Sequence, residues 1–201
     1  MWGVRERCPG VSPSTPGRLL SEVAMGRTIL LTGRPGVGKT TIIKSVAEGL
    51  RDAAGGFYTA EIRQGGRRRG FKIVTLNGKE GILSHVDIKG PPRVSKYGVN
   101  VRDLEEVGVA ALLRAMTEGR CVVVDEIGKM ELFSRRFRET IAAAIESDSL
   151  VVGTVMKSRN PWVDDLKALP QVTVLEVTEA NRDYMAQRVL SLLGISSEVP
   201  S

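Results

Sequence analysis

Residues 33–41, GRPGVGKTT, combine glycines, a lysine and hydroxyl side chains at the spacing G-x-x-x-x-G-K-[ST]. Glycines let backbone N–H groups approach phosphate oxygens without a Cβ in the way. Lys39 supplies a positive charge for the β and γ phosphates, and the Thr40 hydroxyl is a ligand for Mg²⁺. The pattern predicts a nucleotide-binding phosphate loop, whose contacts are Gly33, Arg34, Pro35, Gly36, Val37, Gly38, Lys39, Thr40 and Thr41.

A second motif places two acids, Asp125 and Glu126, directly after the apolar run 121–124. Such a run is typical of a central parallel strand, and ligands of open α/β sheets bind at the carboxyl ends of these strands. Asp125 is therefore predicted to hold Mg²⁺ together with Thr40. Glu126 is predicted to orient or deprotonate a water that attacks the γ phosphorus, which makes Glu126 and Lys39 the candidate catalytic residues.

The segments around these motifs alternate between strand-like and helix-like patterns, which favours an α/β fold with a mostly parallel sheet. Strands are predicted at 28–32, 121–124, 150–155 and 172–177, and helices at 39–50, 134–147, 163–169 and 180–193. Another helix is expected from Asp103, with Glu106 completing a capping box, to about Gly119.

Three further segments alternate polar and apolar residues, as half-buried strands do. They are 56–62, 70–76 and 81–85, and they are separated by Gly65-Gly66 and by Asn77-Gly78. Such pairs favour tight turns. The sequence therefore predicts an antiparallel hairpin and meander that extends the sheet.

The 201 residues are enough for one domain, predicted at 26–194, with a tail at 195–201. Residues 1–25 are rich in proline and glycine and predict a disordered extension. No apolar run is long enough to cross a membrane, and the N-terminus lacks a secretory h-region. Cys8 and Cys121 are the only cysteines, so a disulfide or cysteine metal cluster is not expected and the predicted compartment is the cytoplasm.

A net charge of +6 and a pI near 9.6 raise the question of nucleic-acid binding. Aromatic residues are only 4% of the chain, and no interleaved aromatic and basic pattern suits base stacking. A triphosphate site itself requires positive charge, so nucleic acid is the less favoured partner. We expect a monomer that binds nucleoside triphosphates.

Four segments together resemble one family: GRPGVGKTT, GGFYTAEIRQGGRRRGFKIVTL, SKYGVNVRDLE and VVVDEIGKMEL. They are similar to the cancer-related, thermophile-type nucleoside-triphosphatases, a P-loop NTPase family, over residues 26–193. The resemblance implies a RecA- or AAA-like three-layer α/β sandwich. It also implies Mg²⁺-dependent hydrolysis of ATP, GTP, CTP and UTP to diphosphate and phosphate, with slow turnover and weak base selectivity. By position, Gly128 and Lys129 would border the nucleotide.

Two other functions could use the same phosphate loop. A GTP-operated switch would match D-x-x-G at residues 125–128, but 77–80 and 180–183 only approximate the guanine-reading N-K-x-D. A kinase for a small molecule or nucleic acid would grip an acidic acceptor with its basic hairpin. Glu126 beside Asp125 favours hydrolysis over transfer to an acceptor.

Several other residues have two readings each. An arginine or lysine side chain could neutralise the charge that builds up on the transferring γ phosphate, or it could lie on the surface in contact with solvent. The candidates are Arg63, Arg67, Arg68, Arg69, Arg93, Lys96 and Lys129. Thr154 either senses the γ phosphate or packs in a strand. Asn181 and Arg182 either approach the base or begin the last helix.

Overall fold

The structure is a computed structural model that describes residues 28–195, and the predicted extension at 1–25 lies outside this range, as do residues 196–201. The strands are β1 (Thr28–Gly33), β2 (Ala54–Gln64), β3 (Arg67–Thr75), β4 (Glu80–His85), β5 (Arg93–Val94), β6 (Tyr97–Val99), β7 (Cys121–Ile127), β8 (Val151–Val155) and β9 (Val172–Val177). The α-helices are α1 (Lys39–Leu50), α2 (Val101–Asp103), α3 (Ala110–Thr117), α4 (Arg135–Glu146), α5 (Pro161–Lys167) and α6 (Arg182–Leu192). A π-helix, Leu104–Val109, joins α2 to α3, and 3₁₀ turns occupy Arg51–Ala53 and Glu131–Phe133.

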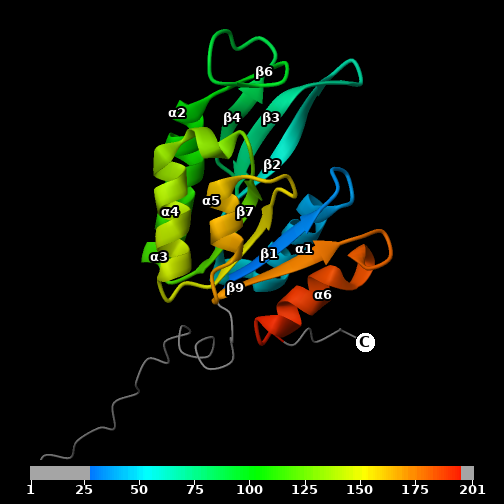
Figure 1. Ribbon diagram of the computed structural model, residues 1–201, viewed down its shortest axis with the longest axis vertical. Coiled ribbons are helices and arrows are strands. Elements are labelled where there is room, and N and C mark those ends of the chain that lie inside the picture. The colour runs from blue at the N-terminus through cyan, green and yellow to red at the C-terminus, as the bar shows by residue number, and fades with distance from the viewer. Residues whose placement is uncertain (1–27, 196–201) are drawn as a thin grey trace, which may run out of the picture.

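All strands belong to one sheet, in the order β5-β6-β4-β3-β2-β7-β8-β1-β9 (Figure 1). The run β2-β7-β8-β1-β9 is parallel, whereas β3, β4, β6 and β5 pair antiparallel beyond β2. The expected α/β sheet with a parallel core and an antiparallel extension is confirmed. One detail matters for the site: β8 lies between β1 and β7, so the two motif-bearing strands are not neighbours.

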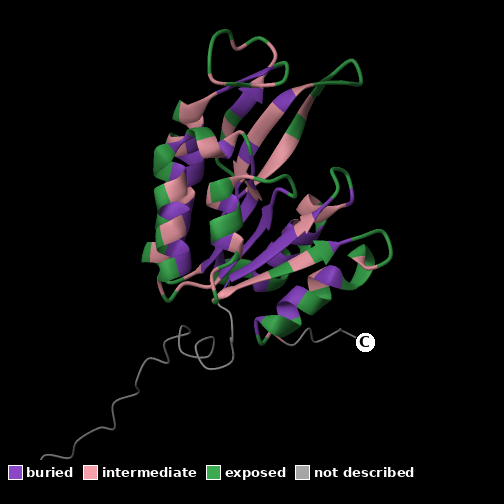
Figure 2. Ribbon diagram, in the orientation of Figure 1, coloured by how far each residue is buried: buried purple, intermediate pink, exposed green. Residues whose placement is uncertain are grey.

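Helices cover both faces of the parallel strands, which makes the three layers. Because successive side chains of a strand point to opposite faces, Leu30 packs with one group of helices and Ile29 and Leu31 pack with the other. The first face carries α3, α4 and α5, and the second carries α1 and α6, as Figure 1 shows. Between these helices β1, β7 and β8 are almost wholly buried, whereas β9 at the edge of the sheet is partly exposed (Figure 2).

The antiparallel strands extend beyond these helices, and the tip of the β2–β3 hairpin is exposed (Figure 2). Gly65 and Gly66, with φ of 55° and 75°, turn the chain there as predicted. Within residues 28–195, no helix combines the length and apolarity needed to cross a membrane.

Two details of the sequence prediction were wrong. The capping box does not form, because the helix begins earlier: Asn100 accepts a hydrogen bond from the Asp103 N–H and caps Val101. Asp103 instead accepts from the backbone N–H of Ile82 on β4, and Glu106 pairs with Arg102. The short strands β5 and β6 were also missed, since two or three residues are too few for alternation to be detected.

Candidate active site

The phosphate loop joins β1 to α1, and its glycines are required by the backbone. Gly36 and Gly38 have φ of 78° and 109°, conformations that side-chain-bearing residues rarely adopt. At Gly33 a Cβ would lie 2.6 Å from the carbonyl oxygen of Val177 on β9. Helix α1 begins at Lys39, so its first unpaired N–H groups and its positive dipole end lie at the loop. The loop can therefore bind phosphate with its backbone.

Lys39, Thr40 and Asp125 come together at the ends of β1 and β7. The Thr40 hydroxyl donates to Asp125 Oδ2 over 2.7 Å, across a sequence separation of 85 residues. The Lys39 ammonium donates to the carbonyl oxygens of Gly33 and Arg34 at 3.2 and 3.4 Å. These contacts join the two predicted motifs into one site.

Asp125 is only 2% exposed and is held by threonine hydroxyls from three directions. Besides Thr40, the buried Thr154 donates to Oδ1 over 2.6 Å. Thr59 on β2 contacts Oδ2 at a longer 3.4 Å. Because β8 lies between β1 and β7, Thr154 is placed to hold the carboxylate from the middle of the sheet. The structure thus gives the Thr154 hydroxyl a hydrogen-bond partner in Asp125.

Glu126 extends beside this cluster and is half-buried. Burial raises the pKa of its carboxyl, while the nearby positive charge of Lys39 lowers it and the charge of Asp125 raises it further. Glu126 therefore lies within electrostatic reach of the lysine of the phosphate loop. A carboxylate of raised pKa is a better proton acceptor than an ordinary one.

A third acid, Glu131, was missed by the sequence reasoning. It is 4% exposed, and burial together with the charges of Glu126 and Asp125 raises its pKa to about 8. Its Oε2 lies close to Gly128, where an added Cβ would be 3.1 Å away, and the same Cβ would be 3.4 Å from Glu126 Cγ. Gly128 thus lets two carboxyl groups approach one another. An acid among Met130, Leu132 and Phe133 in the sequence was the available signal.

Two cavities flank these residues. The first, which we call the loop-side cavity, has a volume of about 500 Å³ and lies between the phosphate loop and the β9–α6 connection. Its lining residues are Arg34, Pro35, Gly36, Val37, Lys157, Glu176, Val177, Thr178, Glu179, Ala180 and Arg182. The Asn181 side chain is bound by backbone groups: its amide donates to the Glu176 carbonyl and its oxygen accepts from the Thr178 N–H. Arg182 does line the cavity.

The second, which we call the hairpin-side cavity, has a volume of about 250 Å³ and lies between the antiparallel strands and the segment after β7. Its lining residues are Thr59, Phe71, Leu83, Val94, Glu126, Gly128, Lys129, Met130, Glu131, Met156 and Ser158. Predicted residues Gly128 and Lys129 therefore adjoin Glu126 on this side of the site.

The other candidate cations are placed differently from Lys129. Arg63 and Arg68 both pair with Glu61, and Arg69 pairs with Asp87. The Arg93 guanidinium donates to backbone carbonyls, and the Lys96 ammonium lies 5.4 Å from the centre of the Tyr97 ring. Exposed Arg67 lies on the same hairpin rim. These contacts agree with the alternative that the arginines of the hairpin lie at the surface in contact with solvent.

The oxygen atoms of Thr40 and Asp125 are of the kind that Mg²⁺ prefers, and they are neighbours. Among the described residues, no group of three or more His, Cys, Asp or Glu side chains could hold a metal ion by itself. The pair of Thr40 and Asp125 suits Mg²⁺, which usually takes one or two carboxylates and completes its shell with phosphate oxygens and water.

Comparison with known proteins finds similarity over nearly all of the described chain. Residues 28–190 match the model of a family described as NTPase. The chain is 51% identical over 165 residues to "Nucleoside-triphosphatase THEP1" of Thermotoga sp. (strain RQ2), covering 82% of this chain and 94% of the relative. It is 40% identical over 170 residues to the protein of the same name from Methanothermobacter thermautotrophicus, covering 83% and 95%.

Two solved structures are similar as well. The crystal structure of THEP1 from the hyperthermophile Aquifex aeolicus has a TM-score of 0.77 and 39% identity, and the match covers 83% of this chain and 98% of that one. The solution structure of a human cancer-related nucleoside triphosphatase has a TM-score of 0.73 and 36% identity, covering 87% and 100%.

Proposed function

The chain belongs to the NTPase family, and from this premise we propose that it is a Mg²⁺-dependent nucleoside-triphosphatase that produces diphosphate and phosphate. The observation that carries the proposal is the 2.7 Å contact between Thr40 and Asp125, which brings a phosphate loop and an acidic pair into one site. The matched relatives bear the name nucleoside-triphosphatase. A GTP switch is less favoured because residues 77–80 and 180–183 only approximate the guanine-reading N-K-x-D.

In this proposal each residue has one task. The phosphate loop and Lys39 bind the β and γ phosphates, and Thr40 with Asp125 would hold Mg²⁺. When bound, Mg²⁺ neutralises charge on the β and γ phosphates. Glu126 takes a proton from the attacking water, whose oxygen bonds to the γ phosphorus as the bond to the β–γ bridging oxygen breaks. Thr154 fixes the Asp125 carboxylate in place.

The loop-side cavity is the proposed place for the ribose and base. It adjoins residues 34–37, and its remaining walls come from the β9–α6 connection. Asn181, the amide best suited to reading a base edge, is occupied by backbone groups. A wall without a dedicated base reader is consistent with weak base selectivity, so we propose ATP, GTP, CTP and UTP as substrates.

Phosphate release by the full chain in the presence of Mg²⁺ tests this proposal. We expect release from all four triphosphates at comparable rates and loss of release when Mg²⁺ is chelated. Glu126→Gln should lower kcat by about 10²–10⁴-fold, the usual contribution of a general base, and leave nucleotide affinity nearly unchanged. Lys39→Ala should weaken binding itself, because the loop then lacks its full positive charge.

Glu48→Gln is the matched control for Glu126→Gln, since it makes the same chemical change on an exposed part of α1. It should hydrolyse at the rate of the unaltered chain. Undetectable release from every triphosphate would reject the proposed function. A preference for GTP over ATP by orders of magnitude would favour the switch.

A further inference from the structure

The hairpin-side cavity is much larger than hydrolysis requires. Its volume is about 250 Å³. A water molecule takes up about 30 Å³ of liquid, so the space is roughly eight times what one attacking water needs. The space beside Glu126 can therefore hold a molecule larger than water.

The walls of this cavity are mostly apolar. Phe71, Leu83 and Val94 come from three antiparallel strands, and Met130 and Met156 face them from the segments after β7 and β8. Apolar walls hold water poorly, whereas ligand pockets combine such walls with a few placed polar groups. Methionine side chains also adapt to the shape of a ligand. The lining thus suits an organic molecule.

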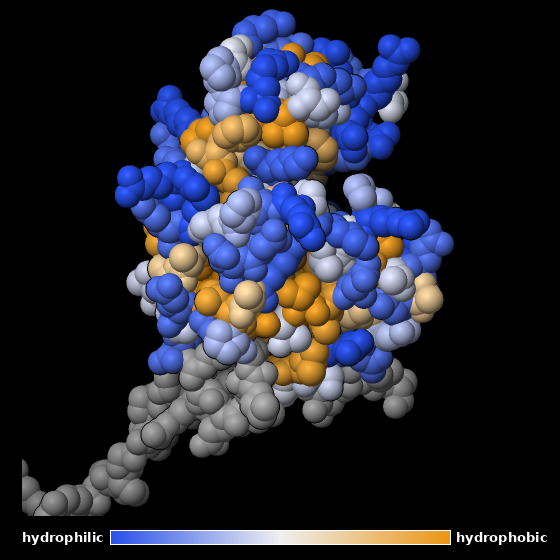
Figure 3. Space-filling model, in the orientation of Figure 1, coloured by the Kyte–Doolittle hydropathy of each residue, from blue (hydrophilic) through white to orange (hydrophobic). Residues whose placement is uncertain are grey.

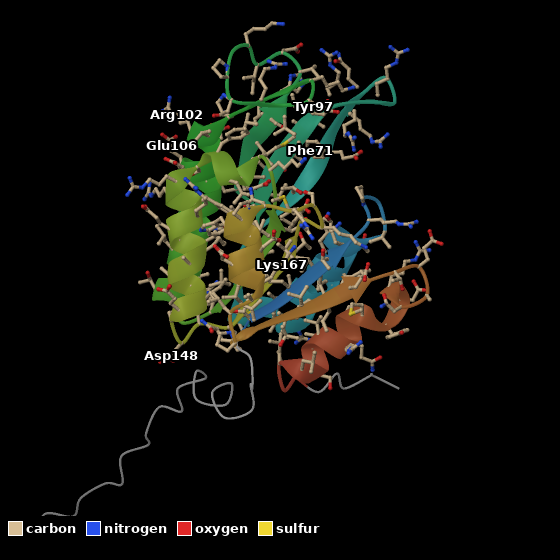
Figure 4. All side chains as sticks on the ribbon, viewed as in Figure 1. Phe71, Tyr97, Arg102, Glu106, Asp148 and Lys167 are labelled. Carbon is tan, nitrogen blue, oxygen red and sulfur yellow. The ribbon has the colours of Figure 1, made fainter. Side chains whose placement is uncertain are left out.

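Contacts behind these walls keep them in position. The Tyr97 ring on β6 packs edge-on against Phe71 with centroids 5.6 Å apart, and Figure 4 shows the two side by side. Arg68 lies 5.1 Å from the centre of the Phe71 ring. On the other side, the ammonium group of Lys167 on α5 donates to the Met156 carbonyl over 2.8 Å. Figure 3 shows hydrophobic surface below the hydrophilic tip of the hairpin region.

The cavity also shares residues with the proposed phosphate site. Glu126 lines the cavity and is within electrostatic reach of Lys39. Thr59 lines it too, and its hydroxyl contacts Asp125 at 3.4 Å. Lys39 and Thr40 approach the acids from the phosphate loop, so a γ phosphate bound there would lie between that loop and the cavity. This step rests on the proposed function.

We propose that the hairpin-side cavity binds a small, uncharged ring compound bearing a primary alcohol, and that this hydroxyl accepts the γ phosphoryl group in place of water. The proton of the hydroxyl passes to Glu126 and its oxygen bonds to the γ phosphorus. The bond from that phosphorus to the β–γ bridging oxygen breaks. The products are a phosphate monoester and the nucleoside diphosphate, and the proton leaves Glu126 for solvent.

Charge and size define the acceptor. Glu126 and Lys129 supply one charge of each sign to the lining and the buried Glu131 is protonated, so the lining has no net charge and favours an uncharged acceptor. The hairpin arginines that could grip an anion already pair with Glu61 and Asp87. A dry cavity of 150 Å³ holds benzene, so 250 Å³ accommodates about ten non-hydrogen atoms. A buried, protonated Glu131 can donate a hydrogen bond to such a molecule.

The test follows the terminal phosphate of γ-labelled ATP in the presence of Mg²⁺ and one of three alcohols: benzyl alcohol, 3-pyridinemethanol or 2-phenylethanol. We expect labelled monoester from at least one alcohol, in addition to free phosphate. Val94→Phe places a ring in the cavity and should lower the ratio of ester to phosphate at least tenfold. Ile82→Phe makes a similar change at an exposed position of β4, in the same antiparallel part of the sheet, and should leave that ratio unchanged.

Met130→Trp fills the same space from the opposite wall, so the test survives if Val94→Phe fails to fold. Free phosphate without ester for all three alcohols would overturn the acceptor site and leave the proposed hydrolysis intact. Ester whose yield is unchanged by both cavity-filling variants would also overturn it, because transfer would then occur elsewhere. If neither ester nor free phosphate is formed, the proposed function itself is rejected.

Discussion

The two halves of the sheet differ in what surrounds their strands. The parallel half is covered by helices on both faces, and β7 and β8 are buried along nearly their whole length. The antiparallel half is exposed at its tip and carries ion pairs, such as Lys72–Glu80 and Arg69–Asp87. The helix-covered half supplies Lys39, Thr40 and Asp125, whereas the exposed half supplies one wall of the hairpin-side cavity.

This difference indicates a division of labour. Groups that must be held within a fraction of an ångström, such as Asp125, lie in the densely packed half, where neighbouring side chains fix their positions. The half with exposed strands can change its side chains with less effect on stability. The antiparallel half is therefore suited to select which molecule reaches Glu126, whereas the packed half holds the groups that carry out the reaction.

The largest effect expected from this contrast is on the free energy of unfolding. It is measured by replacing one phenylalanine in each half of the sheet by alanine. Phe57, in the parallel half, is fully buried and packs 6.5 Å from Phe137 between ring centroids. Phe57→Ala should lower the free energy of unfolding by about 3–5 kcal/mol. Phe71→Ala, in the partly exposed antiparallel half, should lower it by roughly half as much, since less area is buried there. Urea unfolding measures both, and equal losses would break the contrast.

The next effect is a pH dependence at the junction of the two halves. Glu131 has a folded pKa of about 8, raised by burial above its unfolded value of 4.5. The folded state therefore binds the extra proton between these values, so stability should fall as pH rises through this window, at about 1.4 kcal/mol per pH unit. Above pH 8 this loss should level off.

Glu131→Gln should remove most of that slope, because the amide does not titrate. The exposed Glu139→Gln is the matched control and should retain it. Urea midpoints between pH 5 and 8 provide the measurement. A slope that is the same in the unaltered chain and in Glu131→Gln would mean that another group causes the pH dependence.

A smaller effect distinguishes two hydroxyls that hold the same carboxylate. Thr154, buried on β8, donates to Asp125 at 2.6 Å, whereas Thr59 contacts it at 3.4 Å from the antiparallel part of β2. Hydrogen bonds to charged groups contribute about 1.5–3 kcal/mol, so Thr154→Val should lose close to that amount of stability and reduce kcat. Thr59→Val should lose less. Thr154→Ser keeps the hydroxyl and should restore kcat, which a purely steric role would not predict.

The sequence predicted the packed half better than the exposed half, for physical reasons. The predicted helix at 39–50 matches α1 at both ends, because its start is set by the loop glycines and its face by regular apolar spacing. The central strand β7 was found from its continuous apolar run at 121–124. In contrast, β5 and β6 lie where only two or three residues pair, and no local pattern marks them.

Within the site, residues in contiguous motifs could be anticipated and residues supplied by tertiary contacts could not. Spacing alone pointed to Lys39, Thr40 and Asp125. The role of Thr59 depends on how far β2 runs past its pairing with β7, which the sequence does not reveal. Glu131 depends on a turn that buries an acid, and a charged residue in a sequence is normally expected at the surface. Site roles assigned from spacing remain predictions that the variants above test.

The smallest effect expected is at the hairpin rim. Glu61 pairs with Arg68 at 2.7 Å and with Arg63 at 2.6 Å, and hydrogen bonds from Arg68 and then Arg63 lower its pKa. A lowered pKa stabilises the fold above the unfolded pKa and loses that contribution as pH falls through the folded one. These side chains are largely solvent-accessible, so Glu61→Ala should change the unfolding free energy by less than about 1 kcal/mol at pH 7.

Added salt separates this exposed pair network from the buried contacts, because exposed charges are screened over about 10 Å at 0.1 M ionic strength. The difference between Glu61→Ala and the unaltered chain should therefore shrink as salt is raised, whereas the deficit of Thr154→Val should persist. Arg68 also lies over Phe71, and that contact does not require Glu61. If Glu61→Ala lowers the free energy of unfolding as much as Phe71→Ala does, at any salt concentration, the ion pairs contribute as much to the cavity wall as the ring.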